Sequence, residues 1–239
     1  MASNRSRAWT AWLSALVLAI VASSLAPAMT LAATIGSFNI DGTLTLSGSA
    51  PQISFLSSSS PFPPNKATIG PGPTGSFAAL GGTTATILNV SNPPAVTGGA
   101  GFAPQSFLSF DANPGLGTLP LNFIFAGFNS SAQCGLAPAV GQTCTPTGSP
   151  FSFTNTPGGG SSLLFVFQGI SSPAGSTWTG IFSSQFMVPY QSVLATLGNG
   201  GTVSSTYSAS FTVIPEPASM ALMLGGLGIL VGISRRRTR

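Results

Sequence analysis

Side chains that could carry out chemistry are scarce in this sequence of 239 residues. It contains no histidine, and aspartate and glutamate together number three. Hydrolytic and transfer reactions usually need a base that titrates near neutral pH, or a metal held by His, Cys or carboxylates. We therefore expect a protein with no catalytic activity, no cofactor and no metal site.

The two carboxylates that stand between the chain ends, Asp41 and Asp111, would form a glycosidase pair only if folding brought them close together. Asp41 precedes Gly42, and Asp111 precedes the segment Ala112-Asn113-Pro114-Gly115. Both contexts are typical of turns. Asn39 and Asp41 alternate as oxygen ligands of calcium can, but two carboxylates are too few for a strong site. Turn formation is the favoured interpretation for both aspartates.

Charge is concentrated at the two ends of the chain. The formal net charge is +4, yet charged residues make up only 4% of the sequence. Lys66 is the one basic residue of the long middle region, whereas the others are Arg5, Arg7, Arg235, Arg236, Arg237 and Arg239. A surface that binds nucleic acid needs a patch of Lys and Arg that can displace counterions from phosphates. We therefore expect no nucleic-acid partner.

Residues 1–33 have the three parts of a secretory signal peptide. Arg5 and Arg7 provide the positive start, and Ala8 to Val21 provide an apolar run. Small residues follow, so cleavage is expected after Ala32 or Ala33. This predicts a helical signal peptide that directs export through the Sec machinery and is then removed by signal peptidase. The alternative is an uncleaved membrane helix, although the apolar run is shorter than the ~20 residues that a span needs.

Residues 215–239 contain three distinct segments in a fixed order. Pro215-Glu216-Pro217 favours an extended backbone that cannot join a helix. Ala218 to Ile233 is an apolar run of 16 residues, which as a helix would be roughly 24 Å long. Arg235, Arg236 and Arg237 follow it, as expected for a cytoplasmic stop under the positive-inside rule. We expect a transmembrane helix that holds the exported chain transiently in the inner membrane.

This C-terminal segment resembles the PEP-CTERM family of sorting signals. The likeness covers about the last 25 residues and lies in the type, order and position of all three segments. It implies that an exosortase-type membrane protease recognises Pro215, Glu216 and Pro217 and removes the tail. It also implies a Gram-negative host that makes exopolysaccharide and biofilm. The alternative is a plain single-span anchor that stays uncut.

Cys134 and Cys144 are the two cysteines of the chain. A thiol nucleophile would need a neighbouring base, and the sequence has no histidine to supply one. Export to an oxidising compartment favours pairing instead. We predict a structural disulfide, whose loop closure would stabilise the fold by at most roughly 3 kcal/mol.

Residues 34–214 show short alternating runs separated by Gly, Pro, Ser and Asn, which predicts an all-β domain. In the strand predicted at Thr202 to Ile214, one face carries Val203, Ser205, Tyr207, Ala209, Phe211 and Val213, and the other carries Ser204, Thr206, Ser208, Ser210 and Thr212. Leu163 to Phe167 is apolar throughout, as expected for a strand that is covered on both sides. One short helix is predicted at Pro189 to Leu197. Further strands are expected at Phe38–Leu46, Thr83–Val90, Phe107–Phe110, Leu121–Phe128, Phe151–Thr154 and Thr177–Val188.

This number of strands predicts an antiparallel β-sandwich, jelly-roll-like or Ig-like, between the signal peptide helix and the transmembrane helix. Exposed aromatic rings would let such a sandwich bind sugars, and Trp178, Tyr190 and Tyr207 are the candidates. Core packing is favoured for Trp178 and Tyr207, since both lie on apolar strand faces.

Two functional hypotheses remain. The first is a non-catalytic protein of the cell surface or extracellular matrix, associated with exopolysaccharide. The second is a carbohydrate-binding or adhesive module with a specific ligand patch.

Overall fold

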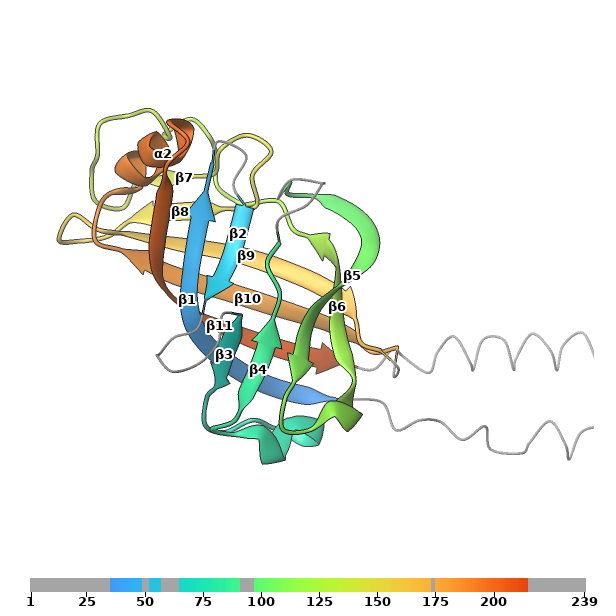
Figure 1. Cartoon of the computed structure of the whole chain (residues 1–239). Coiled ribbons are helices and arrows are strands. Elements are labelled where there is room, and N and C mark those ends of the chain that lie inside the picture. The colour runs from blue at the N-terminus through green and yellow to red at the C-terminus, as the bar shows by residue number, and fades with distance from the viewer. Residues whose placement is uncertain (1–34, 49–51, 57–64, 91–96, 173–174, 215–239) are drawn as a thin grey trace, which may run out of the picture. The chain divides into compact units, whose positions relative to one another are not determined.

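The computed structural model describes residues 35–48, 52–56, 65–90, 97–172 and 175–214 (Figure 1). The chain divides into two units, Met1–Ala32 and Ala33–Arg239, and all described residues belong to the second. The predicted signal cleavage at Ala32 or Ala33 and the predicted tail from Pro215 to Arg239 lie outside the described residues. In the part that is described, no helix has the length and apolar character needed to cross a membrane.

The described chain is built almost entirely from β-strands. They are β1 (Gly36–Ser47), β2 (Gln52–Leu56), β3 (Lys66–Ile69), β4 (Thr84–Ile87), β5 (Ala100–Phe110), β6 (Thr118–Ile124), β7 (Thr143–Cys144), β8 (Ser152–Asn155), β9 (Ser161–Ile170), β10 (Thr177–Phe186) and β11 (Thr202–Ile214). The helix α2 (Tyr190–Gly198) precedes β11, and two short 3-10 turns occupy Gly75–Leu80 and Pro114–Leu116. The predicted all-β class with one short helix is thus confirmed for this region.

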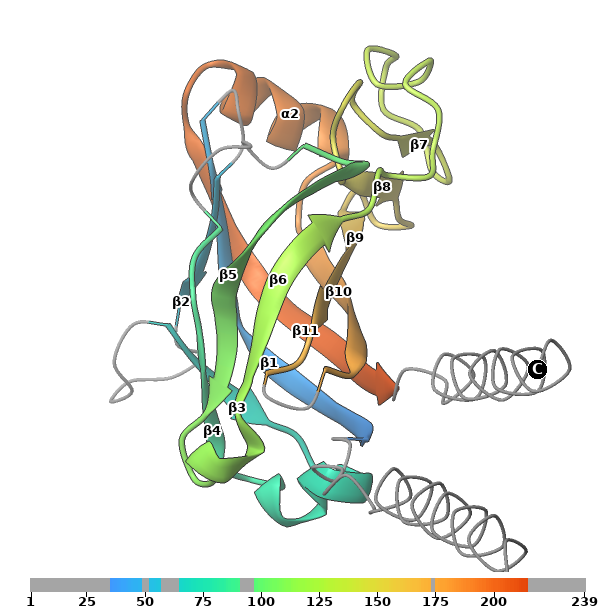
Figure 2. The same cartoon turned by 90° about the vertical axis from the view of Figure 1, so that its right-hand side faces the viewer.

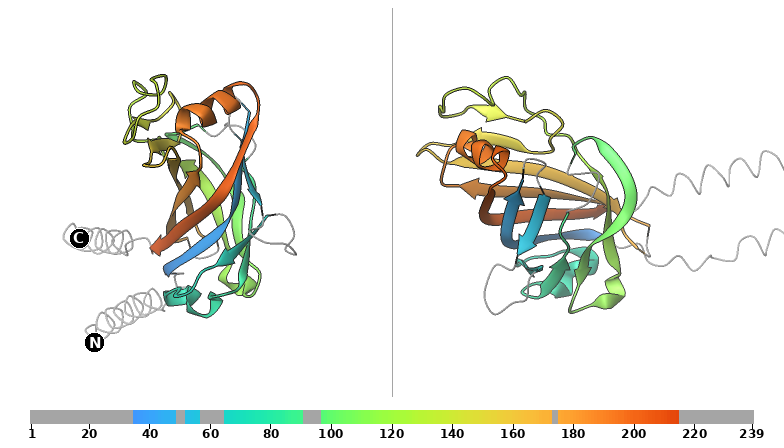
Figure 3. Two further views of the ribbon diagram at one scale, coloured as in Figure 1. Left: turned by 90° about the vertical axis from the view of Figure 1, so that its left-hand side faces the viewer. Right: turned by 45° about the horizontal axis from the view of Figure 1, so that its top comes forward.

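The strands form one antiparallel sheet that closes on itself. Its hydrogen-bonded order is β10, β11, β1, β3, β4, β5, β6, β9, and β9 pairs again with β10. The closing strand β10 uses both edges, because Trp178 lies opposite Gly169 of β9 and opposite Val213 of β11. The two-sheet sandwich that we predicted is therefore not found. The strands surround a common interior, as the two views in Figure 3 show.

Two long strands each share one edge between two shorter partners. The first half of β9, Ser161 to Leu164, pairs with β8, and the second half, Phe167 to Gly169, pairs with β6. In the same way, one edge of β1 pairs with β2 and then with β3. The sheet consequently branches at its upper end in Figure 1, where β7, β8 and α2 lie.

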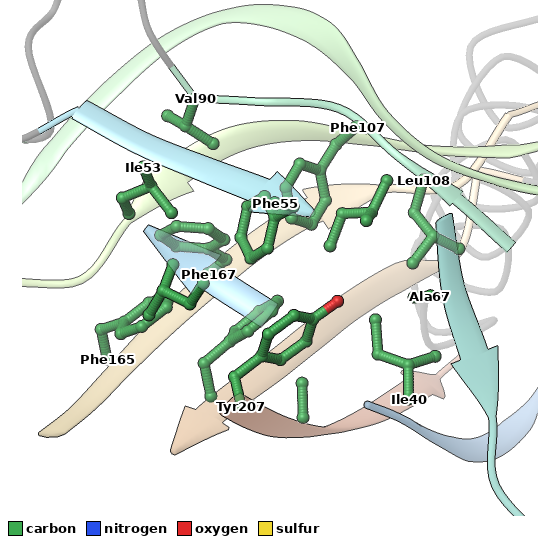
Figure 4. Close-up of a cluster of buried hydrophobic side chains, with 14 of the residues drawn as sticks. Ile40, Ile53, Phe55, Ala67, Val90, Phe107, Leu108, Phe165, Phe167 and Tyr207 are labelled. Carbon is green, nitrogen blue, oxygen red and sulfur yellow. The ribbon is translucent and has the colours of Figure 1, made fainter. Parts of the chain in front are cut away.

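Large aromatic side chains fill the interior. An eight-stranded closed sheet leaves a space that side chains can fill completely. Phe182 stacks on Phe165 with 4.9 Å between ring centroids, and Phe38 stacks on Phe211 at the same distance. Figure 4 shows part of this cluster, in which side chains from β1, β2, β5, β9 and β11 meet. The alternation predicted for β11 is confirmed, since Tyr207, Ala209, Phe211 and Val213 are all buried.

Two predictions about local structure need correction. Asn39 to Gly42 was expected to form a turn, but β1 continues through it because Phe38, Ile40 and Leu44 keep a strict inward alternation. The run Leu163 to Phe167 was expected to be covered on both faces. Instead Leu163, Phe165 and Phe167 point inward and are buried, whereas Leu164 and Val166 are half-buried on the outer face.

The predicted helix at Pro189 to Leu197 is found with a shift of one residue. Pro189 is its N-cap, in an extended conformation, and the helix runs from Tyr190 to Gly198. Proline suits this position because its missing N–H would have no helical partner there. Buried Tyr190, Val193 and Leu197 form the face that packs on the sheet.

Candidate functional site

The carboxylate of Asp111 takes part in a polar cluster on the outer face of β3 and β4. Its Oδ1 atom lies 2.7 Å from Nζ of Lys66, the one ion pair among the described residues. The hydroxyls of Thr84 and Thr86 donate hydrogen bonds to the same carboxylate at 2.7 and 2.8 Å. Burial alone would raise the pKa of Asp111. The hydrogen bonds from Lys66, Thr84 and Thr86 and the positive charge of Lys66 outweigh burial and lower the pKa.

The structure does not bring Asp41 and Asp111 together as a pair. Asp41 lies in the middle of β1, opposite Thr68 of β3, and Thr68 lies opposite Thr84 of β4. Asp111 follows β5, the next strand after β4. Two strands thus separate the two carboxylate positions, a backbone distance of roughly 14 Å at the usual strand spacing. No group of three or more His, Cys, Asp or Glu residues that could hold a metal occurs in the described chain.

Cys134 and Cys144 form the predicted disulfide, with 5.0 Å between their Cα atoms. Hydrogen bonds tie this disulfide loop to α2. The hydroxyl of Tyr190 donates to the backbone oxygen of Gln133 at 2.9 Å, and the side-chain amide of Gln191 donates to that of Leu136 at 3.2 Å. The disulfide therefore fixes a loop that also holds the helix in place.

Asn155 on β8 forms hydrogen bonds with both the same loop and the helix. Its Oδ1 atom accepts a hydrogen bond from the backbone N–H of Tyr190 at 2.9 Å. Its amide nitrogen donates to the backbone oxygen of Ala139 and to Oε1 of Gln191. Because Asn155 is buried and its side chain is satisfied, this end of the sheet is held by a polar network and not by apolar contacts alone.

The aromatic residues that we singled out as ligand candidates are in the core. Trp178 and Tyr190 are both fully buried, and Tyr207 is 3% exposed. The indole Nε1 of Trp178 donates a hydrogen bond to the backbone oxygen of Pro120 at 2.9 Å, so its polar atom is also satisfied inside the fold. Their burial leaves none of these three rings with a face for a ligand in this structure.

Among the residues that the structure describes, the aromatic rings that reach the surface belong to phenylalanines that sequence reasoning missed. Phe125 is 38% exposed and Phe128 is 70% exposed, while Phe102 and Phe123 are half-buried. The rings of Phe123 and Phe125 meet edge to face, with 4.9 Å between their centroids. The one signal in the sequence was the spacing of Phe123 and Phe125, which places both on one face of an extended chain.

Phe102 and Phe123 line a hollow of about 590 Å³ on the outer face of the sheet, which we call the outer-face hollow. It lies across β5, β6, β9 and β10, which follow one another in Figure 2. Its lining consists of Gly101, Phe102, Asn122, Phe123, Gln168, Gly169, Ile170 and Thr177. The lining combines aromatic rings, amide groups and a hydroxyl, without a charged residue.

Comparison with known proteins identifies the C-terminal segment. The family model of the PEP-CTERM protein-sorting motif matches residues 213–237. The chain therefore carries a PEP-CTERM sorting motif, as its sequence predicted. No curated protein and no solved structure matches the chain.

The sorting motif defines the general class of this protein. It marks an exported protein that an exosortase membrane protein processes and that is directed to the cell envelope or surface. The match begins at Val213, and β11 ends at Ile214. The motif thus starts at the last two residues of the described sheet.

Proposed function

We propose that this protein is a non-catalytic component of the cell surface or extracellular matrix, freed from its membrane tail by an exosortase and associated with exopolysaccharide. The observation that carries the proposal is the direct junction between β11 and the sorting motif. Because β11 is paired along both edges by β1 and β10, the folded region extends to the motif without an intervening linker. The motif therefore holds an exported, folded β domain at the membrane until the tail is removed.

The surface chemistry of the described region supports a matrix role. Asp41, Lys66 and Asp111 are its charged residues, and two of them pair with each other. Outward positions of β11 carry hydroxyl side chains instead, at Ser204, Thr206, Ser208, Ser210 and Thr212. A neutral, hydroxyl-rich surface can exchange hydrogen bonds with the hydroxyl groups of a polysaccharide at little desolvation cost.

A carbohydrate-binding module is the second candidate function, and the outer-face hollow is the observation that favours it. The two candidates share the same export route, so they differ only in whether the surface contains a specific ligand site.

The experiment that tests the proposed processing is mass spectrometry of the protein from the medium and the envelope of cells that contain a working exosortase. We expect a chain that ends near Pro215 and lacks Ala218 onward. A variant with Glu216→Ala should keep its tail, whereas Ser234→Ala, outside the Pro-Glu-Pro segment, should be processed normally. Intact tails in the unmodified protein would instead establish the uncut single-span anchor.

A further inference from the structure

The outer-face hollow is organised by one row of residues that runs across four neighbouring strands. Gly101 of β5 lies opposite Phe123 of β6, Phe123 lies opposite Gln168 of β9, and Gln168 lies opposite Thr179 of β10. Residues in one cross-strand row share the same face of a sheet. The Phe123 ring therefore stands between a position without a side chain and an amide.

A β-bulge in β6 brings a second polar group into the hollow. The register between β6 and β9 shifts between Leu121 and Phe123, so Asn122 is the extra residue. Consecutive residues in a regular strand point to opposite faces. Here Asn122 and Phe123 are both half-buried and both line the hollow. Bulges re-aim side chains in this way next to functional sites.

Two glycines form the floor of the hollow, and one of them is sterically required. A Cβ atom at Gly169 would lie 1.8 Å from the backbone oxygen of Pro120 and 2.5 Å from Nε1 of Trp178. A Cβ atom at Gly101 would instead lie 3.6 Å from the Phe123 ring, which is ordinary contact. The buried Trp178, whose indole donates a hydrogen bond to the backbone oxygen of Pro120, fills the space that a Cβ atom at Gly169 would need.

The polar side chains of the hollow are available to a ligand. The side chains of Asn122, Gln168 and Thr177 form no hydrogen bond with another described residue. Each amide can both donate and accept hydrogen bonds, and a hydroxyl can do the same. This set matches a ligand whose own groups are hydroxyls, because a hydroxyl also donates and accepts.

We propose that the outer-face hollow is a binding site for a neutral polysaccharide, in which a sugar ring stacks on Phe123 and its hydroxyls bond to Asn122 and Gln168. A phenyl ring presents a flat apolar surface with a negative face, which fits the C–H face of a pyranose. The ring of Phe125 packs edge to face against the Phe123 ring. The inference rests on the proposed function in one respect, since it places the ligand outside the cell.

The same residues argue against two other occupants. An anionic polymer would need a cation, and the lining contains no Lys or Arg. A second copy of the chain, docking through its apolar residues, would bury the three unpaired polar side chains at about 1–3 kcal/mol for each group left unsatisfied. Sugar hydroxyls avoid this cost because they pair with the amides.

The test uses the protein as recovered from cells that export it, in affinity electrophoresis. The gels contain dextran, hydroxyethyl cellulose or galactomannan as neutral probes, and alginate as the anionic comparison. We expect at least one neutral probe, but not alginate, to retard the protein. Phe123→Ala should weaken this binding by about tenfold, equivalent to about 1.4 kcal/mol. Gln168→Ala should also weaken it.

The matched control is Phe128→Ala, which removes a more exposed ring outside the hollow and should leave the retardation unchanged. Thermal unfolding of each variant separates loss of the site from loss of the fold, and Gln168→Ala provides the test if Phe123→Ala is unstable. Retardation by no neutral probe, or equal retardation of all variants, would overturn the proposal. The proposal would also be overturned if the protein dimerised at high concentration, Phe123→Ala abolished the dimer, and no glycan retarded the protein. If glycan binding fails while the tail is still removed, only this inference falls; retained tails would count against the proposed processing alone.

Discussion

The phenol ring of Tyr207 on β11 occupies the space above Gly42 on β1, its partner across the strand pair. A Cβ atom at Gly42 would lie 2.7 Å from Cε1 of that ring and 2.9 Å from its hydroxyl oxygen. Gly42 occupies an inward position of β1, between Ile40 and Leu44. The glycine therefore leaves room for a large aromatic side chain in the closed interior, and both residues of the pair offer sharp tests of the fold.

Gly42→Ala should destabilise the protein by roughly 1–3 kcal/mol, because overpacking a dense core forces side chains and backbone to move. Chemical denaturation of the full chain measures this change in the free energy of unfolding. Gly70→Ala is the matched control, since its Cβ would have no neighbour closer than 3.7 Å. Equal stability of the two variants would contradict the packing described for Tyr207.

Tyr207→Phe should leave the free energy of unfolding unchanged or raise it by up to about 1–3 kcal/mol, the cost of an unsatisfied buried polar group. The Tyr207 hydroxyl is buried and has no hydrogen-bond partner in the described structure. Denaturation at neutral pH checks this, with Trp178→Phe as the contrast, because that change removes a satisfied hydrogen bond and should destabilise. A loss of stability in Tyr207→Phe would show that the hydroxyl has a partner.

Stability at alkaline pH should depend on the same tyrosine. Burial raises the pKa of Tyr207, and the negative charge of Asp41 raises it further. The unfolded-state pKa of tyrosine is about 10. Below that pH the stability of the folded protein is fully retained; above it the unfolded state loses its proton while the folded state keeps it, so stability falls. The unfolding temperature of the unmodified protein should therefore fall more steeply above pH ~10 than the unfolding temperature of Tyr207→Phe. Parallel curves would refute a raised pKa of Tyr207 in the folded state.

Removing the disulfide by Cys134→Ala together with Cys144→Ala should lower the free energy of unfolding by up to roughly 3 kcal/mol, the loop-closure value for about ten residues. The loop also holds α2 through the bond from Tyr190 to Gln133. Hydrogen exchange should consequently increase in the helix as well as in the loop. Reduction of the unmodified protein serves as the control, since it breaks the same bond without changing the sequence. Unaltered hydrogen exchange in α2 would show that the disulfide does not help to hold the helix in place.

Asp111→Asn should cost at most about 1 kcal/mol at neutral pH, as is usual for partly exposed ion pairs. Because the folded-state pKa of Asp111 is lowered, its contribution is present above the unfolded-state pKa of about 3.9 and is lost as pH falls through the folded value. The difference between the unmodified protein and Asp111→Asn should therefore shrink in acid. Asp41→Asn is the control, because Asp41 takes no part in the bonds to Lys66, Thr84 and Thr86. A constant difference across pH would mean that the charge of Asp111 is not the cause.

The sequence predicted the individual strands best where alternation was strict and long. The bounds of β11, Thr202–Ile214, agree with the prediction, and α2 differs by one residue. It missed β2, β3 and β7, which have five residues or fewer and show little periodicity by themselves, although the equally short β8 was found near Phe151–Thr154. It also extended β6 to Phe128, whereas the bulge at Asn122 and the end at Ile124 depend on the neighbouring strand β9.

The candidate site could not be read from the sequence in the same way. Asn122, Phe123 and Gln168 meet only because β6 pairs with the second half of β9. Trp178 looked like a ligand candidate by type, but the closed sheet turns it inward over Gly169. For Trp178 the apolar strand face had already favoured the core, whereas no local pattern marked Phe123 as a ring that reaches the surface.

By itself, the sequence determined the features that depend on neighbours along the chain. These are the order of Pro-Glu-Pro, apolar run and arginines that the sorting motif requires, the pairing of two nearby cysteines, and the alternation of single strands. Only the tertiary structure decided that one sheet closes through β9 and β10, that Tyr190 is buried, and that an uncharged hollow opens on the outer face. The physical reason is that strand pairing joins segments far apart in the chain, and a shift of one residue in register moves every side chain to the opposite face.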